Sequence, residues 1–279
     1  MKKLLLGICV LSMGGTGWAQ TAPPLGSAAS FAVLGSSTVT CTGVTTITGN
    51  LGVSPGTAFT GFPTPCTVVG GTIDAADATS LLAHADATRA YAALLLETCT
   101  TSLTGKDLGG MTLVPGVYCF SSSAGLTGQL TLNGNGVYVF KIGSTLTTAS
   151  NSSVVLTNGA LCGNVFWQVG SSATLGTGTN FKGNLIALTS DTVTTNVSVT
   201  GRVFALGGAV TLDTNTITAG ACGSTGGGGG GVGGGDGDHD KDACHNDEDD
   251  RDKDHHDKDR HDKDKDHHDK DNRDDDDKD

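Results

Sequence analysis

The sequence predicts an all-β protein built as a β-solenoid, and three observations lead to this prediction. First, four short apolar runs recur at residues 137–143, 165–170, 185–189 and 203–207, and each precedes a Thr-apolar-x-Thr pattern. Second, this part of the chain is rich in Thr and Gly and poor in charge. Third, only one stretch has helical periodicity. A repeat of about 18–20 residues with short strands fits one solenoid coil per repeat.

The four Thr-apolar-x-Thr patterns lie at residues 145–148, 174–177, 192–195 and 211–214, so the intervals are 29, 18 and 19 residues. We expect the longer first interval to contain a loop near residues 158–163. Because side chains alternate between the two faces of a strand, the apolar residue of each pattern should point into the solenoid. The first and third residues should then point outward, and the last should lie at the edge of the same face.

One helix is expected between about residues 74 and 98, with Thr72 or Asp74 capping its start through a short polar side chain. We expect His84 to be solvated. The apolar residues that fall mostly on one side of this helix are Leu81, Leu82, Ala85, Ala92 and Leu96.

The charge is concentrated at the C-terminal end of the chain. Residues 236–279 hold 22 of the 29 acidic residues and 10 of the 17 basic residues, so this segment accounts for the whole net charge of −12. The preceding body has no basic stripe, which argues against nucleic acid as a partner. We also expect no cofactor and a monomeric protein.

The N-terminus has the pattern of a secretory signal peptide at residues 1–19. Lys2 and Lys3 precede an apolar run, and small residues flank a predicted cleavage site before Gln20. The run is too short to span a bilayer. We therefore expect export, to the periplasm or the extracellular medium.

Six cysteines remain in the body after removal of this signal, and an even number in an exported protein suggests disulfides. Sequence does not choose among the pairings, and sequential neighbours are our working hypothesis. Cys244, in the tail, is either free or linked to another molecule. The hypothesis pairs Cys41 with Cys66, Cys99 with Cys119, and Cys162 with Cys222.

Residues 20–225 form the predicted folded domain, followed by a Gly-rich linker at 226–235 and a tail at 236–279. The tail alternates Asp with Lys, Arg and His and has too few apolar residues to form a core, so we expect it to be disordered. It reads as a solvating extension. Weak binding of divalent cations by its Asp and His side chains is the alternative.

Stacked coils would place the outward threonines in a regular array, with equivalent residues about 4.8 Å apart. Thr is stiff at χ1, so its methyl and hydroxyl groups would form a flat, uncharged surface that can hold ordered water. The plainer interpretation is that Thr is simply a good strand residue and that the face is scaffold.

The sequence resembles the secreted ice-binding, or antifreeze, proteins of bacteria, fungi and algae. The matching stretches are residues 25–41, 47–63, 107–119, 163–180 and 209–215, of which NVFWQVGSSATLGTG and GNLGVSPG are the most specific. The resemblance implies a discontinuous triangular β-solenoid with one long α-helix packed along its side. It also implies that a flat face of the solenoid adsorbs to ice, giving thermal hysteresis and inhibition of ice recrystallisation.

Members of this family carry a loose T-A/G-x-T/N motif on that face. Residues 148–151 and 177–180 match the motif, whereas Thr195 and Thr214 are each followed by Asn, and Asp213 adds a charge. The predicted ice-binding residues are Thr145, Thr147, Thr148, Thr174, Thr177, Thr192, Thr194, Thr195, Thr211 and Thr214.

Two other function classes, an enzyme and a surface scaffold, are alternatives to ice binding. Some β-helical enzymes degrade polysaccharides with clustered carboxylates. Asp191 and Asp213 lie near equivalent places on successive coils, but no basic or His partner accompanies them. We therefore expect no catalytic residue, and no metal site in the body. The alternative function is a secreted or cell-surface adhesin or structural scaffold with a cation-binding tail.

Overall fold

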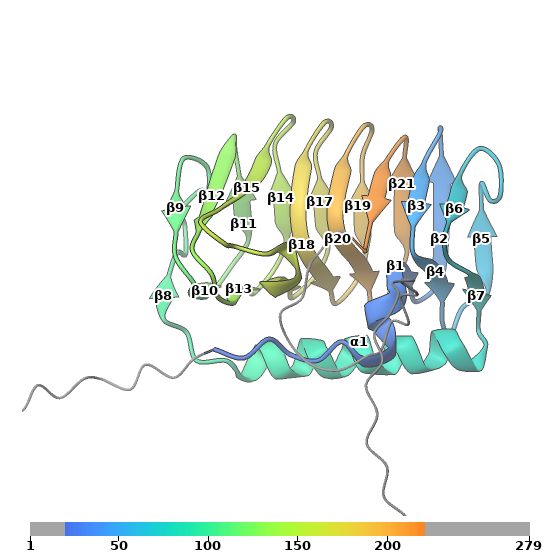
Figure 1. Ribbon diagram of the computed structural model, residues 1–279, viewed down its shortest axis with the longest axis horizontal. Helices are drawn as coiled ribbons and strands as arrows, with labels where there is room; N and C mark the ends of the chain where they lie inside the picture. Colours follow the sequence, from blue (N-terminus) through green and yellow to red (C-terminus); the bar gives the residue numbers. More distant parts are fainter. Residues whose placement is uncertain (1–19, 221–279) are drawn as a thin grey trace, which may run out of the picture. The chain divides into compact units, whose positions relative to one another are not determined.

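The computed structural model describes residues 20–220, which form a solenoid of parallel strands with one long helix along its side (Figure 1). The predicted signal peptide, linker and tail lie outside the described residues. Strands from two sheets make up three faces, and each full coil contributes to all three. The predicted fold class, an all-β solenoid with one helix, is confirmed.

The first face is a seven-stranded parallel sheet, which we call the open face. In this sheet β2 pairs with β21, so the N-terminal strands β2 and β5 lie beyond the last C-terminal strand. The order of the coils therefore does not follow the order of the chain. In sheet order the strands are β11 (Ala124–Leu126), β14 (Leu146–Thr148), β17 (Ala173–Leu175), β19 (Asp191–Val193), β21 (Val210–Asp213), β2 (Thr38–Thr42) and β5 (Ala58–Thr60).

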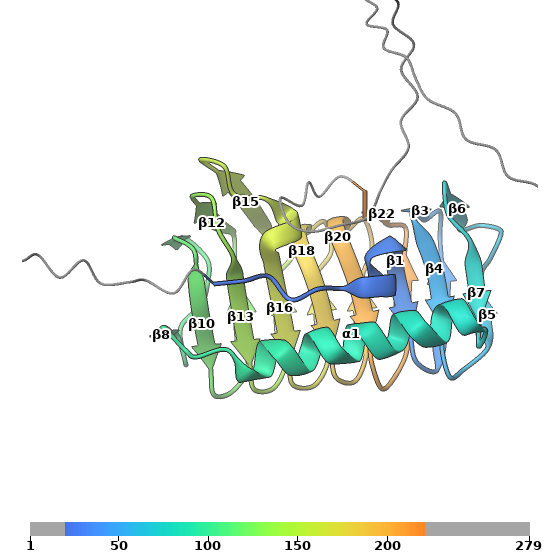
Figure 2. The same ribbon diagram turned by 60° about the horizontal axis from the view of Figure 1, so that its bottom comes forward.

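The second face lies beneath the helix, and we call it the helix-covered face (Figure 2). The second halves of β18 (Asn180–Ala187) and β20 (Ser198–Ala205) belong to it. Its other strands are β8 (Thr101–Ser102), β10 (Gly116–Phe120), β13 (Tyr138–Ile142), β16 (Val165–Val169), β1 (Phe31–Gly35), β4 (Asn50–Val53) and β7 (Ile73–Ala75).

The third face contains the first halves of β18 and β20. Both strands bend onto the helix-covered face at stacked glycines: Gly201 has φ of 145°, and a Cβ there would lie 1.9 Å from the carbonyl oxygen of Gly183. Only glycine fits such a bend. The other strands of the third face are β9 (Thr112–Leu113), β12 (Gln129–Asn133), β15 (Ser153–Thr157), β22 (Thr216–Thr218), β3 (Thr46–Thr48) and β6 (Thr67–Val69).

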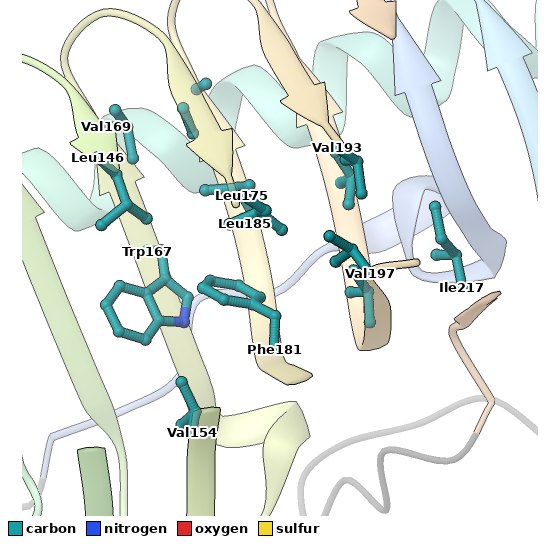
Figure 3. Close-up of a cluster of buried hydrophobic side chains, with 14 of the residues drawn as sticks. Leu146, Val154, Trp167, Val169, Leu175, Phe181, Leu185, Val193, Val197 and Ile217 are labelled. Carbon is teal, nitrogen blue, oxygen red and sulfur yellow. The ribbon is translucent and has the colours of Figure 1, made fainter. Parts of the chain in front are cut away.

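The interior of the solenoid is filled by side chains that stack from coil to coil (Figure 3). Trp167 has its ring centroid 4.0 Å from that of Phe140 and 5.0 Å from that of Phe181, and its Nε1 donates to the carbonyl oxygen of Lys182 at 3.0 Å. The prediction that the apolar residue of each repeat points inward is confirmed by the burial of Leu146, Leu175, Val193 and Leu212.

The helix α1 spans Ala78–Leu96, so the predicted start at residue 74 and the caps at Thr72 or Asp74 are wrong. Asp77 caps the helix: its carboxylate accepts from the backbone N–H of Ser80 at 2.8 Å, and Ser80 Oγ accepts from the N–H of Asp77 at 3.1 Å. This reciprocal pair satisfies two free donors of the first turn. Asp74 instead lies buried in β7, where pairing with β4 extends the backbone.

The helix buries a different side from the predicted one. Leu81, Leu82 and Leu96 are 59%, 55% and 86% exposed. The reason is the shape of the helix-covered face. Large side chains such as Phe166 and Phe204 point from this face toward the helix, so small residues on the contacting side of the helix let it pack closely. The buried helix residues are Ser80, Ala83, Ala87, Ala90, Tyr91 and Leu94.

His84 is not simply solvated, as the sequence suggested. Its Nε2 lies 2.9 Å from the carbonyl oxygen of Leu206, which fixes the ring against the solenoid. The short 3₁₀ helix Gly26–Ser30 also contacts α1. No helix in residues 20–220 is long and apolar enough to cross a membrane.

Disulfides join Cys41 to Cys66 and Cys99 to Cys119, which confirms two of the three hypothesised pairs. Cys162 is also disulfide-bonded; Cys222, its predicted partner, lies outside the described residues. The loop expected near residues 158–163 is confirmed, because β15 ends at Thr157 and a 3₁₀ helix follows at Cys162–Asn164.

Candidate functional site

A row of six threonines crosses the open face, one on each of six neighbouring strands. Successive members are direct partners in the strand register, and parallel strands lie about 4.8 Å apart. All six side chains are exposed or half-exposed. We call this set the central row; in sheet order it consists of Thr147, Thr174, Thr192, Thr211, Thr40 and Thr60.

The hydroxyl groups of the central row have no hydrogen-bond partner in the part of the chain that the structure describes. The neighbouring hydroxyls two residues away along the strands behave differently. Thr145 donates to Ser123 Oγ at 2.8 Å, Thr38 to the carbonyl oxygen of Ala58 at 2.9 Å, and Thr194 to that of Leu175 at 2.7 Å. The central row therefore offers free donors and acceptors, whereas its flanks are held by the protein.

Alignment of the four Thr-apolar-x-Thr patterns placed the first repeat two residues out of register with the structure. Thr147, and not Thr145, pairs with Thr174, because Leu146 lies opposite Ala173 and not opposite Leu175. Thr148 consequently faces the interior and is 2% exposed, so its prediction as a surface residue is wrong. Its Oγ1 lies 2.8 Å from Thr179 Oγ1 and accepts from the backbone N–H of Gly176, which joins two coils from within.

The last threonine of each remaining pattern lies where the chain leaves the open face. Thr177 is exposed and its Oγ1 lies 3.4 Å from Thr194 Oγ1. Thr195 and Thr214 both donate to the carboxylate of Asp213, at 2.5 Å and 2.9 Å. These bonds hold the pKa of Asp213 below its ordinary value. The charge predicted on this face is therefore present at its edge, with its oxygens engaged by hydroxyls.

The carboxylates of Asp191 and Asp213 do not form a pair. Asp191 is in register with Ala173 and Val210 and points into the solenoid, where it is 1% exposed, whereas Asp213 lies on the outer edge. Burial raises the pKa of Asp191 well above its ordinary value. Within the described range, no three His, Cys, Asp or Glu side chains gather in a way that could hold a metal ion.

Sequence analysis missed two members of the central row, Thr40 and Thr60. The alternation Thr38-Val39-Thr40-Cys41-Thr42 was the available signal for an outward-facing strand. Its position next to Thr211 could not be read from chain order, because the N-terminal coils stack on the last C-terminal coil.

The family model described as "Ice-binding-like" matches residues 33–218. An ice-binding protein from Nostoc sp. (strain HG1) is 56% identical over 199 residues, which are 70% of this chain and 73% of the relative. One from Colwellia sp. is 37% identical over 210 residues, covering 70% of this chain and 83% of the relative.

Solved structures agree with the sequence matches. The crystal structure of an ice-binding protein from the Antarctic ascomycete Antarctomyces psychrotrophicus superposes with a TM-score of 0.69 at 43% identity, covering 71% of this chain and 98% of that one. An ice-binding protein from an Antarctic biological consortium gives a TM-score of 0.69 at 43% identity, covering 72% and 92%. The chain therefore belongs to the ice-binding protein family.

Proposed function

We propose that this protein adsorbs to ice through the central row of the open face. The observation that carries the proposal is the row itself: six threonines in strand register, exposed or half-exposed, with hydroxyls that bond to nothing in the described chain. The relatives named above are ice-binding proteins, which supports the same function. The alternative, an adhesin or scaffold, has no such support.

Adsorption would work by ordering water rather than by chemistry on a substrate. Each Thr hydroxyl can donate and accept, and each methyl restricts the neighbouring water molecules. Because the χ1 angles are stiff and the strands evenly spaced, the waters held along the row would lie at regular intervals close to those of the ice lattice. A surface covered by bound protein would stop growing there, which lowers the freezing point and blocks recrystallisation.

We further propose that the protein is exported and acts as a monomer, with the tail as a solvating extension. The disulfides Cys41–Cys66 and Cys99–Cys119 support export, since such bonds persist in oxidising compartments. The part of the chain that the structure describes gives no support to catalysis. We propose no enzymatic activity, no nucleic-acid partner and no cofactor.

The test is a bulky substitution in the middle of the row. Thr192→Tyr should remove most of the inhibition of ice recrystallisation, because the larger side chain holds the ice surface away from the neighbouring threonines. Thr174→Tyr should act in the same way. Circular dichroism and the melting temperature should stay unchanged, since both side chains point outward.

The matched control is Thr88→Tyr, which makes the same change at an exposed position on α1. It should retain full activity. A Thr192→Tyr variant that keeps the full wild-type activity would show that the open face is the wrong surface. An inactive but folded wild-type protein would contradict ice binding itself.

A further inference from the structure

The third face carries a second array of threonines, on strands β22, β3 and β6 and the first half of β20. Two rows follow the strand register: the first crosses all four strands, and the second ends at β3, because Thr48 pairs with Val69 on β6. One row consists of Ser198, Thr216, Thr46 and Thr67, and the other of Thr200, Thr218 and Thr48. We call these seven residues the side array.

The side array has the same geometry as the open face and a second row besides. Neighbouring strands are about 4.8 Å apart, and residues two positions apart on one strand are about 6.6–6.8 Å apart. The residues between the two rows, Val199, Ile217 and Ile47, are buried, which fixes the direction of the side chains on either side of them. All seven side chains of the array are exposed or half-exposed.

The hydroxyl groups at the centre of this array also make no hydrogen bond within the described chain. Over residues 20–220, Thr46, Thr48, Thr216 and Thr218 make no side-chain hydrogen bond. At the border the situation changes, since Lys182 Nζ donates to Thr200 Oγ1 at 2.7 Å. Asn180 and Lys182 follow on the next strand, so a charge marks where the array ends.

The side array and the central row belong to the same coils but to different faces. The strands β2 and β21 of the open face turn into β3 and β22 of the third face. The corner between them contains the positive-φ residues Gly43 and Thr214 and the exposed Val44. Because the chain turns there, the two surfaces cannot both lie flat on a single ice plane.

We propose that the side array is a second ice-contact surface, which adsorbs to a different set of ice planes from those met by the central row. The proposal rests on the proposed function, because it extends ice adsorption from one face to two. Its physical basis is the two-dimensional array of unoccupied hydroxyls and methyls, without charge among them. A molecule with two such faces would cover more orientations of a growing crystal than a molecule with one.

The experiment measures adsorption of the fluorescently labelled chain, residues 20–279, to a single ice crystal that exposes all planes. The main comparison is between wild type, Thr46→Tyr, Thr192→Tyr and the double variant. We expect Thr46→Tyr to lose labelling on one set of planes and Thr192→Tyr on another, while the double variant labels none. Thr218→Tyr should reproduce the effect of Thr46→Tyr from the neighbouring strand. The control Thr131→Tyr, at the far end of the third face on β12, should label like the wild type.

The outcomes separate the two proposals. If the wild type adsorbs and Thr192→Tyr alone abolishes all labelling, the central row is the only ice-contact surface. The proposal that the side array contacts ice is then wrong. The same conclusion follows if Thr46→Tyr and Thr218→Tyr, both folded by circular dichroism, label the same planes as the wild type. If the folded wild type labels no plane, the proposed function itself fails.

Discussion

At the scale of single residues, Asp191 is the side chain least suited to its surroundings. Both carboxylate oxygens are buried without a hydrogen-bond partner in the described chain, on a strand whose register neighbours are Ala173 and Val210. An unpaired polar group in such a position destabilises the folded state by about 1–3 kcal/mol. Burial also raises the pKa of this carboxyl well above its ordinary value, because the apolar interior disfavours the charged form.

Asp191→Val should therefore increase the free energy of unfolding by about 2 kcal/mol or more at pH 7, since a side chain of similar size replaces the unpaired carboxyl. The pKa of Asp191 is raised in the folded state, so the folded protein is most stable when this carboxyl is protonated. This contribution to the free energy of unfolding is fully present below about pH 3.9, the ordinary pKa of Asp. It is lost as the pH rises toward the folded pKa, by about 1.4 kcal/mol per pH unit. The gain from Asp191→Val should accordingly grow with pH from about pH 4 upward.

Denaturant unfolding of wild type and variant across this pH range measures the effect. Asp191→Asn is the control, because it keeps a polar group but cannot ionise; its stability relative to Asp191→Val should not change with pH. An Asp191→Val variant less stable than the wild type at pH 7 would mean that the carboxyl has a partner in solution.

At the scale of elements, the turns between the open face and the third face repeat one conformation. Asn151, Gly178, Asn196 and Gly43 have φ of 58°, 71°, 61° and 65° at equivalent turns of successive coils. Thr214 occupies the same place between β21 and β22 with φ of 54°. A β-branched residue is an outlier there, and the left-handed conformation costs an ordinary residue about 1–2 kcal/mol.

Thr214→Asn should stabilise the protein by up to about 1 kcal/mol, because Asn tolerates this conformation, as it does at residue 196. The variant loses the hydroxyl bond to Asp213 but leaves the bond from Thr195 in place. Thermal unfolding measures the change. The reverse substitution one coil away, Asn196→Thr, should lower stability by a similar amount, and equal stability of both variants to the wild type would show that the turn is unstrained.

Gly43 shows how closely these turns stack. A Cβ at this position would lie 2.1 Å from Thr214 Oγ1, so the glycine allows both the left-handed backbone and the contact with the next coil. The corner of the solenoid is thus set by local conformation and by packing between coils at once. The close contact between these two turns helps to keep β2 and β21 in register.

At the scale of the whole molecule, the solenoid and the tail have separate compositions. The proposed ice-contact surfaces lie entirely within residues 38–218, while the net charge belongs to residues 236–279. An uncharged contact surface suits ordered water, because charged side chains would hold a more liquid-like hydration layer. The charge is placed far along the sequence from the threonine rows.

Removal of residues 226–279 should leave inhibition of ice recrystallisation unchanged, provided that the shortened chain, residues 20–225, is folded. The physical reason is that every threonine of the central row remains. A side-by-side assay of both forms at equal molar concentration measures this. A marked loss of activity in the folded shortened form would assign part of the function to the tail.

The sequence alone determined the solenoid, the inward apolar residues and most of the central row. It could do so because the repeat length and the alternation along a strand are local properties, which Thr174, Thr192 and Thr211 display directly. Two cysteine pairs were also accessible, since each joins neighbours in the sequence.

Only the tertiary structure decided which coils lie side by side and which side of the helix is covered. Thr40 joins the central row because β2 pairs with β21, a contact between residues about 170 positions apart. Leu81 and Leu82 are exposed because aromatic side chains of the helix-covered face pack against the alanine side of α1. These features depend on the shapes of surfaces that meet only after folding, so no local pattern in the chain could specify them.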